Sequence, residues 1–515
     1  MRRTARRKPS ARRPPGGGRI ALWLLVVAAA VLALAFAGYA AAARWLLSGP
    51  RLRAWINTSP QTTMLDWDEA VSRWPGTVRL KNLRIRGSDP SVEWIIRLAE
   101  ARADYSIVAL LSRTFKVSRV QGSGLSFHLR QKLDPKDPTN PPVSVLPPIP
   151  GFADPPLRSP EEPPVSAEEG NPWTIQISGI AIGQFEEIWF DAYRFEGGAR
   201  LSGEFLLRPG QRARVGPAVI EFQKGSLNLG REALISEVAG RLQATIAEWD
   251  PRRVQGDAVW RNVSAEVDVH GPDPSLEFLN YYFRHAREPR FAKGRGVVSL
   301  GASIEHGEAS GRALLAARGA SARQSGVDLT GNLRAALRIS KWDLVSGEME
   351  LSGSSLQLSD VTASGTGDSR DWWARLDLPQ ARLRRGLEAK VKIECRDARP
   401  LLAVLKAGVP SWAQGLVSLD GLTAEAQVAM SRPRTRVHEL EARGGKYHIL
   451  GEYERRGEDE RGVFLIESNL LRVGVKTLGG QASVELFGPR GWYFRERNLF
   501  GENSRGDSEL PTKTK

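Results

Sequence analysis

The clearest hydrophobic pattern in the chain lies between residues 387 and 396, where apolar and charged side chains alternate at every position. A second run, between residues 422 and 430, repeats the apolar half of this pattern. A period of two residues is typical of a β-strand with one dry face, because successive side chains point to opposite sides of the sheet. Each run therefore predicts a strand, and the residues predicted to line an apolar groove or core are Leu387, Ala389, Val391, Ile393, Leu422, Ala424, Ala426 and Val428.

The same alternation returns along most of the chain, for example at residues 263–269 and 333–339, and 51 glycines supply turns between such runs. This pattern predicts a mainly β fold, an antiparallel meander with one solvated face and a few short helices. So much one-sided sheet must pair as a β-sandwich or close into a barrel, or else curve into an open half-barrel groove. Periodicity alone favours a sandwich or barrel with an ordinary core.

The N-terminal region differs from the rest, because residues 20–43 contain no charged side chain. At about 1.5 Å per residue, a helix of this length covers the roughly 30 Å hydrocarbon core of a bilayer. We therefore predict a transmembrane helix over residues 20–45. Residues 1–19 are basic and contain no Asp or Glu, so they are predicted to form a cytoplasmic tail. A cleaved signal peptide is the alternative, although its apolar region usually has only about 7–15 residues.

Residues 131–172 carry 13 of the 32 prolines. Proline removes a backbone donor and fixes φ, so this stretch predicts an extended linker or long loop. It divides an N-terminal α/β unit, residues 46–130, from a larger β-rich domain, residues 173–498. Residues 499–515 are polar and are predicted to be disordered.

Two short segments interrupt the β pattern in related ways. Residues 273–285 and 397–408 each predict a short helix with Asp as a candidate N-cap. Each is followed by a predicted strand that contains the tripeptide Val-Ser-Leu. Two repeats of about 120 residues, each with several strands and one helix, are the resulting prediction.

The sequence contains no catalytic or cofactor-binding motif, so we expect no enzyme activity, no cofactor and no metal. Cys395 is the only cysteine and lies on an apolar row, which indicates a core or groove residue rather than a nucleophile. His128 and His270 fall on the polar faces of predicted strands and are expected to be solvated.

The net charge of +15 is concentrated in the N-terminal tail. This placement indicates a signal for membrane topology and contact with anionic lipid, rather than nucleic-acid binding.

Residues 74–90 and 92–130 follow a lone apolar span and contain WPGTVRLKNLRIRGSDP and then VEWIIRLAEARADYSIVALLSRTFKVSRVQGSGLSFHLR. This region resembles the N-terminal part of AsmA-like proteins, relatives of the TamB and bridge-like lipid-transfer proteins. Residues 400–428 and 440–453 are similar in style to the C-terminal β region of that family. The resemblance implies a long curved antiparallel sheet that forms a half-barrel groove, with a β-sandwich as the alternative. It also implies a bacterial inner-membrane anchor, a periplasmic location and no catalytic residues.

Two functions follow as hypotheses. The first is a lipid-handling protein of the cell envelope and its outer membrane, in which an apolar groove shields phospholipid or other acyl chains from water. The second is a non-catalytic scaffold or assembly factor that binds another envelope protein, with residues 131–172 as a docking arm. An enzyme acting on envelope polysaccharide is disfavoured, because no acid–base pair stands out.

Overall fold

The computed structural model of the chain describes residues 17–506 except 51–52, 55–56, 58–62, 89–90, 138–139, 159–173, 209–210, 251–252, 255, 274, 366–368, 406–419, 432–433, 458 and 480. The described strands form one sheet of 26 members, not the two packed sheets of the sandwich alternative. The fold is therefore mainly β, as the sequence predicts.

The strands follow one another closely along the chain. They are β1 (Thr63–Asp66), β2 (Glu69–Val71), β3 (Thr77–Ser88), β4 (Val92–Tyr105), β5 (Thr114–Gln131), β6 (Thr174–Ile182), β7 (Phe185–Phe190), β8 (Tyr193–Arg208), β9 (Arg212–Leu229), β10 (Glu232–Ile235), β11 (Ala239–Trp249), β12 (Val263–Asp273), β13 (Arg290–Ala292), β14 (Arg295–Glu305), β15 (Glu308–Gln324), β16 (Val327–Asp343), β17 (Met349–Glu350), β18 (Ser354–Ser364), β19 (Ser369–Leu383), β20 (Leu387–Asp397), β21 (Asp420–Ser431), β22 (Arg434–Gly444), β23 (Tyr447–Arg456), β24 (Asp459–Ser468), β25 (Arg472–Leu478) and β26 (Gln481–Glu485).

The sheet is a meander in which sequence neighbours are mostly also spatial neighbours. Among the described strands, every pairing is antiparallel except those of β5 with β6 and with β7. Strands β6 and β7 lie one after the other beside β5, and β8 then pairs antiparallel with both. The sheet therefore continues without interruption from the strands before the proline-rich segment to those after it.

Parallel neighbours cannot be joined by a tight turn, so the chain must return along the sheet between β5 and β6. Residues 132–173 make this crossover, and their described part packs against the sheet. Leu133, Leu146 and Ile149 are buried there. The sequence predicted a linker between two β units, whereas in the structure strands from both sides of it are hydrogen-bonded to each other.

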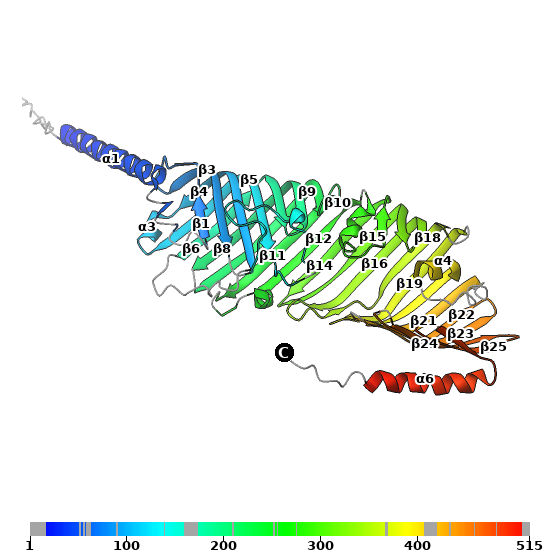
Figure 1. Ribbon diagram of the computed structural model, residues 1–515. Coiled ribbons are helices and arrows are strands. Elements are labelled where there is room, and N and C mark those ends of the chain that lie inside the picture. Colours follow the sequence, from blue (N-terminus) through cyan, green and yellow to red (C-terminus); the bar gives the residue numbers. More distant parts are fainter. Residues whose placement is uncertain are drawn as a thin grey trace, which may run out of the picture.

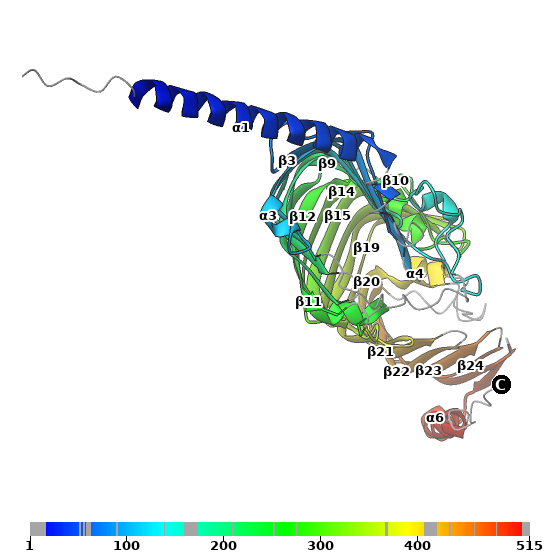
Figure 2. The same cartoon turned by 90° about the vertical axis from the view of Figure 1, so that its left-hand side faces the viewer.

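The sheet is long and strongly curved. Figure 1 shows the strands in sequence order from the helix α1 (Gly17–Ser48) at one end to the helix α6 (Pro489–Gly506) at the other. Seen along its length, the sheet bends into an open arch (Figure 2). Right-handed strand twist contributes to this shape. Bulges add to it by bending the strand that carries them, as between Ala317 and Ala320 of β15 and between Asp377 and Gln380 of β19.

The shorter helical elements are α3 (Ile107–Leu110), η1 (Val143–Val145), η2 (Gly256–Asn262), η3 (Leu276–Tyr281) and α4 (Ala398–Leu405). Elements η3 and α4 are the two helices predicted between the strands. The carboxylate of Asp397 accepts from the backbone N–H of Arg399 at 2.9 Å, so Asp397 caps α4 as predicted. The cap of η3 is Ser275 instead of the predicted Asp. The second Val-Ser-Leu lies outside the described residues, so the repeat stays a prediction.

The described residues contain no helix that is long and apolar enough to cross a membrane. The side chains of residues 17–29, 32 and 35 of α1 are outside the described part of the chain. At its other end α1 is attached to the sheet, since Trp67 Nε1 donates to the carbonyl of Leu47 at 3.2 Å. The rings of Phe36 and Trp74 lie 5.1 Å apart.

The C-terminal helix α6 was not predicted. Disorder was expected from residue 499, but α6 continues to Gly506, and residues 507–515 lie outside the described chain. Tyr493 and Phe500 are buried against Val463 and Leu465 of β24. Three large side chains on one face of α6, including Trp492, hold the helix against the sheet.

Candidate functional site

One face of the sheet is apolar from its first strands to its last, because the hydrogen-bonding register aligns apolar residues with apolar residues. In the middle of the sheet, Val269, Leu300, Ala313 and Leu337 form a single cross-strand row over β12, β14, β15 and β16. Directly opposed partners share a face of the sheet. The surface is termed the inner apolar face, and its cross-strand partners include Leu98, Leu125, Leu201, Ile220, Leu242, Val267, Ala302, Leu333, Leu358, Ala374, Cys395, Leu422, Ala442 and Ile449.

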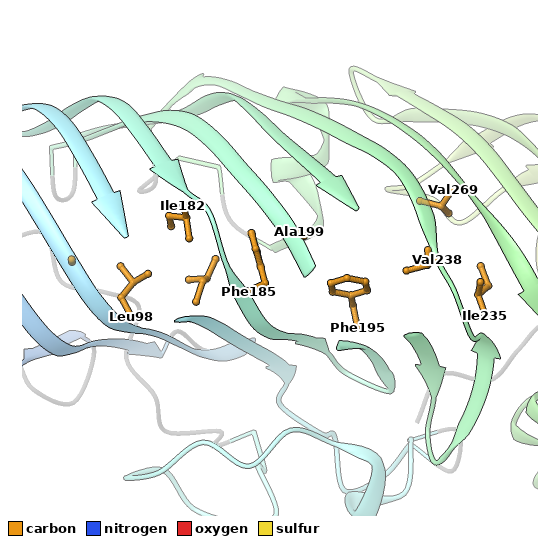
Figure 3. Packing of buried hydrophobic residues seen from close by; sticks show 10 residues of the cluster. Leu98, Ile182, Phe185, Phe195, Ala199, Ile235, Val238 and Val269 are labelled. Carbon is orange, nitrogen blue, oxygen red and sulfur yellow. The ribbon is translucent and has the colours of Figure 1, made fainter. Parts of the chain in front are cut away.

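This face lies on the inner side of the arch. Figure 3 shows Leu98, Phe185, Phe195 and Val238 pointing into the space that the curved strands enclose. Phe195 and Phe222 pack edge to face there, with their ring centroids 4.9 Å apart. The buried residues of this first part extend over β4 to β12 and make the largest apolar cluster on the face.

The eight residues predicted to line a groove or core lie together on the inner apolar face. They form opposed pairs between β20 and β21, such as Ala389 with Val428, Val391 with Ala426, and Ile393 with Ala424. Ala389 and Leu422 are buried, and the other six are half-buried. The structure therefore brings the two predicted rows together on one face of the sheet.

Helical elements cover part of the inner apolar face. Leu276 and Phe278 of η3 pack against Leu315 and Ala317 of β15. Ala398 and Leu401 of α4 contribute to the cluster around Trp372 and Cys395. In Figure 2, α4 lies within the arch, on the side away from β11.

Between these covered regions the inner apolar face is accessible. Leu300 is 37% exposed and Leu337 is 42% exposed, although both belong to the apolar row in the middle of the sheet. Met430, farther along the same face, is 48% exposed. An apolar row with this much exposure differs from an ordinary core, whose large side chains lose nearly all contact with water.

The opposite surface of the sheet is polar and carries many ion pairs, which identifies it as the outer face. On β20, Lys392 lies 3.0 Å from Glu394, and Lys390 lies 3.4 Å from Glu425 of β21. These side chains are exposed or half-buried. The chain therefore separates apolar from charged side chains across a single layer of backbone.

The proline-rich crossover covers a polar cluster on this outer face. Arg130 is 1% exposed; its Nε donates to Glu93 at 2.9 Å, and its Nη2 donates to the carbonyl of Ala153 at 2.7 Å. His128 Nδ1 lies 3.1 Å from the carbonyl of Pro148. The expectation that His128 is solvated is wrong, because the crossover packs over it and leaves it only 3% exposed. His270 is exposed, as predicted.

The electrostatics of this cluster favour an ionised glutamate. His128 Nε2 lies 2.7 Å from Glu187 Oε1, and Arg194 Nε donates to Glu187 Oε2 at 2.9 Å. Burial opposes ionisation of Glu187, but these hydrogen bonds outweigh it and hold the pKa of Glu187 below its usual value. Strand alternation placed His128 on a polar face, but it gave no sign that a distant segment would bury it.

Cys395 is fully buried on the inner apolar face, between Ala374 and Leu422. Burial, followed by the charge of Asp397, raises the pKa of the thiol to about 11. A nucleophilic cysteine requires an accessible, low-pKa thiol. The structure therefore places Cys395 with the packing residues.

No family model, curated protein or solved structure matches this chain. The inner apolar face is therefore interpreted from its own geometry.

Proposed function

We propose that this protein is a membrane-tethered carrier of phospholipid or other acyl lipid in the bacterial cell envelope, and that the inner apolar face acts as a half-barrel groove for acyl chains. One observation carries the proposal most directly. The row through Leu300, Ala313 and Leu337 is apolar, in register and partly exposed.

The energetics of such a surface favour an apolar occupant. Each CH₂ group removed from water contributes about 0.8 kcal/mol, so an acyl chain along the groove would be bound without directional chemistry. A row that runs across many strands offers contact along a chain's length. A soluble polar substrate would gain little from the same surface.

The N-terminal helix supports a membrane tether in this proposal. Residues 20–43 carry no charge, and among the described side chains of α1, Val31 is 59% exposed and Leu34 is 73% exposed. Leu47, at the end of α1, packs with Val78 and Val117 of the first strands. The groove would thus begin beside the bilayer, with the basic tail in the cytoplasm and the sheet in the periplasm.

The resemblance of residues 74–90, 92–130, 400–428 and 440–453 to AsmA-like proteins points to the same function, namely phospholipid handling in outer-membrane homeostasis. The resemblance and the apolar face are independent arguments, since one rests on sequence motifs and the other on register and exposure. The scaffold hypothesis has less support, because the described part of its docking arm packs on the chain's own sheet.

The proposal is tested by photo-crosslinking in the full-length protein in cells whose lipids carry ³²P. A photoreactive phenylalanine analogue replaces either Leu337, on the inner apolar face, or Arg338, its exposed neighbour on the outer face. We expect labelled phospholipid to crosslink at position 337 and not at position 338. An adduct with a protein at position 337, with no lipid adduct, would favour the scaffold hypothesis instead.

A matched pair of substitutions tests whether the groove binds the lipid. Ala313 lies directly opposite Leu337, whereas Ala316 lies on the outer face of the same strand. Ala313→Asp should reduce lipid crosslinking at position 337 by at least about tenfold, because a buried carboxylate in the groove carries a large desolvation cost. Ala316→Asp should leave the crosslinking unchanged. Equal effects of the two substitutions would contradict the proposal.

A further inference from the structure

A cavity lies on the outer face, near the end of the sheet that carries α1. Its volume is ≈ 490 Å³, and residues from β1, β3 and β4 line it together with Pro150 and Gly151 of the crossover. The charged residues in its wall are Arg84, Arg86, Arg97, Asp66 and Glu186. Its arginines lie on the outer face, which is the face opposite the apolar side chains of Leu83 and Leu98.

Three guanidinium groups are brought together by strand register. Arg84 of β3 lies directly opposite Arg97 of β4. Arg86 is two residues farther along β3 and therefore shares the same face. Like charges placed directly opposite each other in a sheet repel and destabilise it. A negative charge between them would remove this cost.

The nearby carboxylates satisfy only one of the three arginines. Arg84 Nη2 lies 2.8 Å from Asp66 and 2.7 Å from Asp68. Within the described chain, Arg97 is half-buried and forms neither an ion pair nor a hydrogen bond through its guanidinium. Glu186 lines the cavity and is exposed, and no ion pair joins it to the described arginines.

The third arginine is held in place by the crossover. Arg86 Nη1 donates to the carbonyl of Pro150 at 3.1 Å, and the guanidinium lies 5.4 Å from the centre of the Phe152 ring. Its Nε is buried without a hydrogen-bond partner. Gly151 has φ +90, a backbone conformation that L side chains rarely adopt, and a Cβ there would lie 1.5 Å from Arg86 Nη1. A side chain at position 151 would therefore be strained and would displace the guanidinium of Arg86.

We propose that this cavity binds a phosphate group, either as free phosphate or as the headgroup of a lipid. Guanidinium groups pair with phosphate oxygens through charge-assisted hydrogen bonds. The guanidinium of Arg97 and the Nε of Arg86 offer more N–H donors than the two oxygens of a carboxylate can accept, so a phosphate group suits the site better. The inference goes beyond acyl-chain binding, because this site lies on the opposite face of the sheet from the groove.

The test is calorimetric titration of the full-length protein in a non-ionic detergent, at constant ionic strength. One titrant is inorganic phosphate, and the other is a water-soluble short-chain phosphatidylglycerol. We expect binding of at least one probe, weakened about tenfold or more by Arg97→Gln, since a hydrogen bond to a charged group is lost. The probe that binds more tightly identifies the source of the phosphate.

Arg79→Gln is the matched control. Arg79 is exposed on the outer face of β3, opposite Arg102, and does not line the cavity. This substitution should leave the affinity unchanged. Arg97→Gln should also raise the unfolding temperature of the ligand-free protein, because it removes the repulsion with Arg84. The proposal is overturned if neither probe binds, or if Arg97→Gln binds as tightly as the wild type.

Discussion

Cys395 lies where β20 meets β19 and β21, with no exposed surface. The pKa of its thiol is raised from 9.0 to about 11, mainly by burial. This lowers the fraction of reactive thiolate near pH 8 about a hundredfold. We expect a maleimide to label Cys395 in guanidinium chloride at the rate of a free thiol, and at least about a hundredfold more slowly in the native protein. Rapid labelling without unfolding would contradict the observed burial.

Arg130 joins β5 to β4 through a buried ion pair with Glu93, and it holds the crossover through hydrogen bonds to the carbonyls of Pro147 and Ala153. Arg130→Ala leaves Glu93 buried without its partner, so we expect a loss of about 3–5 kcal/mol in the free energy of unfolding. Residues 142–158 should then become sensitive to limited proteolysis, because Arg130 also donates to the carbonyl of Ala153. Chemical denaturation and protease digestion measure the two effects.

Arg102→Ala serves as the control for this prediction. Arg102 is 49% exposed and lies 3.6 Å from Asp104. Exposed ion pairs of this kind contribute at most about 1 kcal/mol. Comparable losses from the two substitutions would mean that burial of Arg130 does not set the effect.

The helix α6 is attached to the outer face of the sheet by the apolar side chains packed on β24 and by ion pairs of Arg490, Glu496 and Arg497. Tyr493 is 2% exposed, whereas its neighbour Phe494 is 50% exposed. Tyr493→Ala should release α6 and speed hydrogen exchange in α6 and β24, with a cost of about 3–5 kcal/mol, as for other buried aromatic residues. Phe494→Ala should have little effect. Hydrogen exchange read by mass spectrometry distinguishes the two, and equal exchange would show that α6 does not depend on Tyr493.

Individual elements differ in how well the sequence predicts them. The alternation at residues 387–396 predicts β20 because one face of that strand is apolar and the other is charged. Asp397 predicts the start of α4 because the capping contact is local. Helix α6 could not be predicted because most of its residues are polar. The apolar contacts that hold it, made by Tyr493 and Phe500, are with the separate strand β24.

The residues of the candidate site also differ in how well the sequence predicts them. The eight apolar residues of β20 and β21 follow from alternation within each strand. The arginine cavity and the burial of His128 depend on the crossover returning over the outer face, and on β3 meeting β4 in one particular register. A pattern with a period of two residues says which face a side chain takes, but not what lies across from it.

For the whole molecule, buried glutamates predict a dependence of stability on pH. The pKa values of Glu187 and Glu454 are lowered despite burial, through hydrogen bonds from His128 and Arg194 and from Arg461 and Arg434. A lowered pKa contributes stability above the unfolded-state value of about 4.5, and this stability is lost as the pH falls through the folded-state value.

The unfolding temperature should therefore change little between about pH 7 and pH 5.5 and fall progressively below about pH 4.5. Scanning fluorimetry over this range measures it. Glu454→Gln should make the acid-side slope shallower, since one of the titrating groups is removed. An unfolding temperature that rises on acidification would show that these carboxylates are not stabilised by their partners.

The parallel pairings of β5 with β6 and β7 also set the order in which the sheet can be completed. Most other described strands pair antiparallel with a strand one or two elements earlier in the chain, so growth at that edge relies on contacts closer in sequence. One edge of β5 stays unpaired until β6 and β7, which follow residues 132–173 in the chain, have been supplied. If the chain folds from its N-terminus as it is synthesised, the sheet would thus assemble in two stages. The first stage ends at β5, and the second begins when β6 and β7 pair with it.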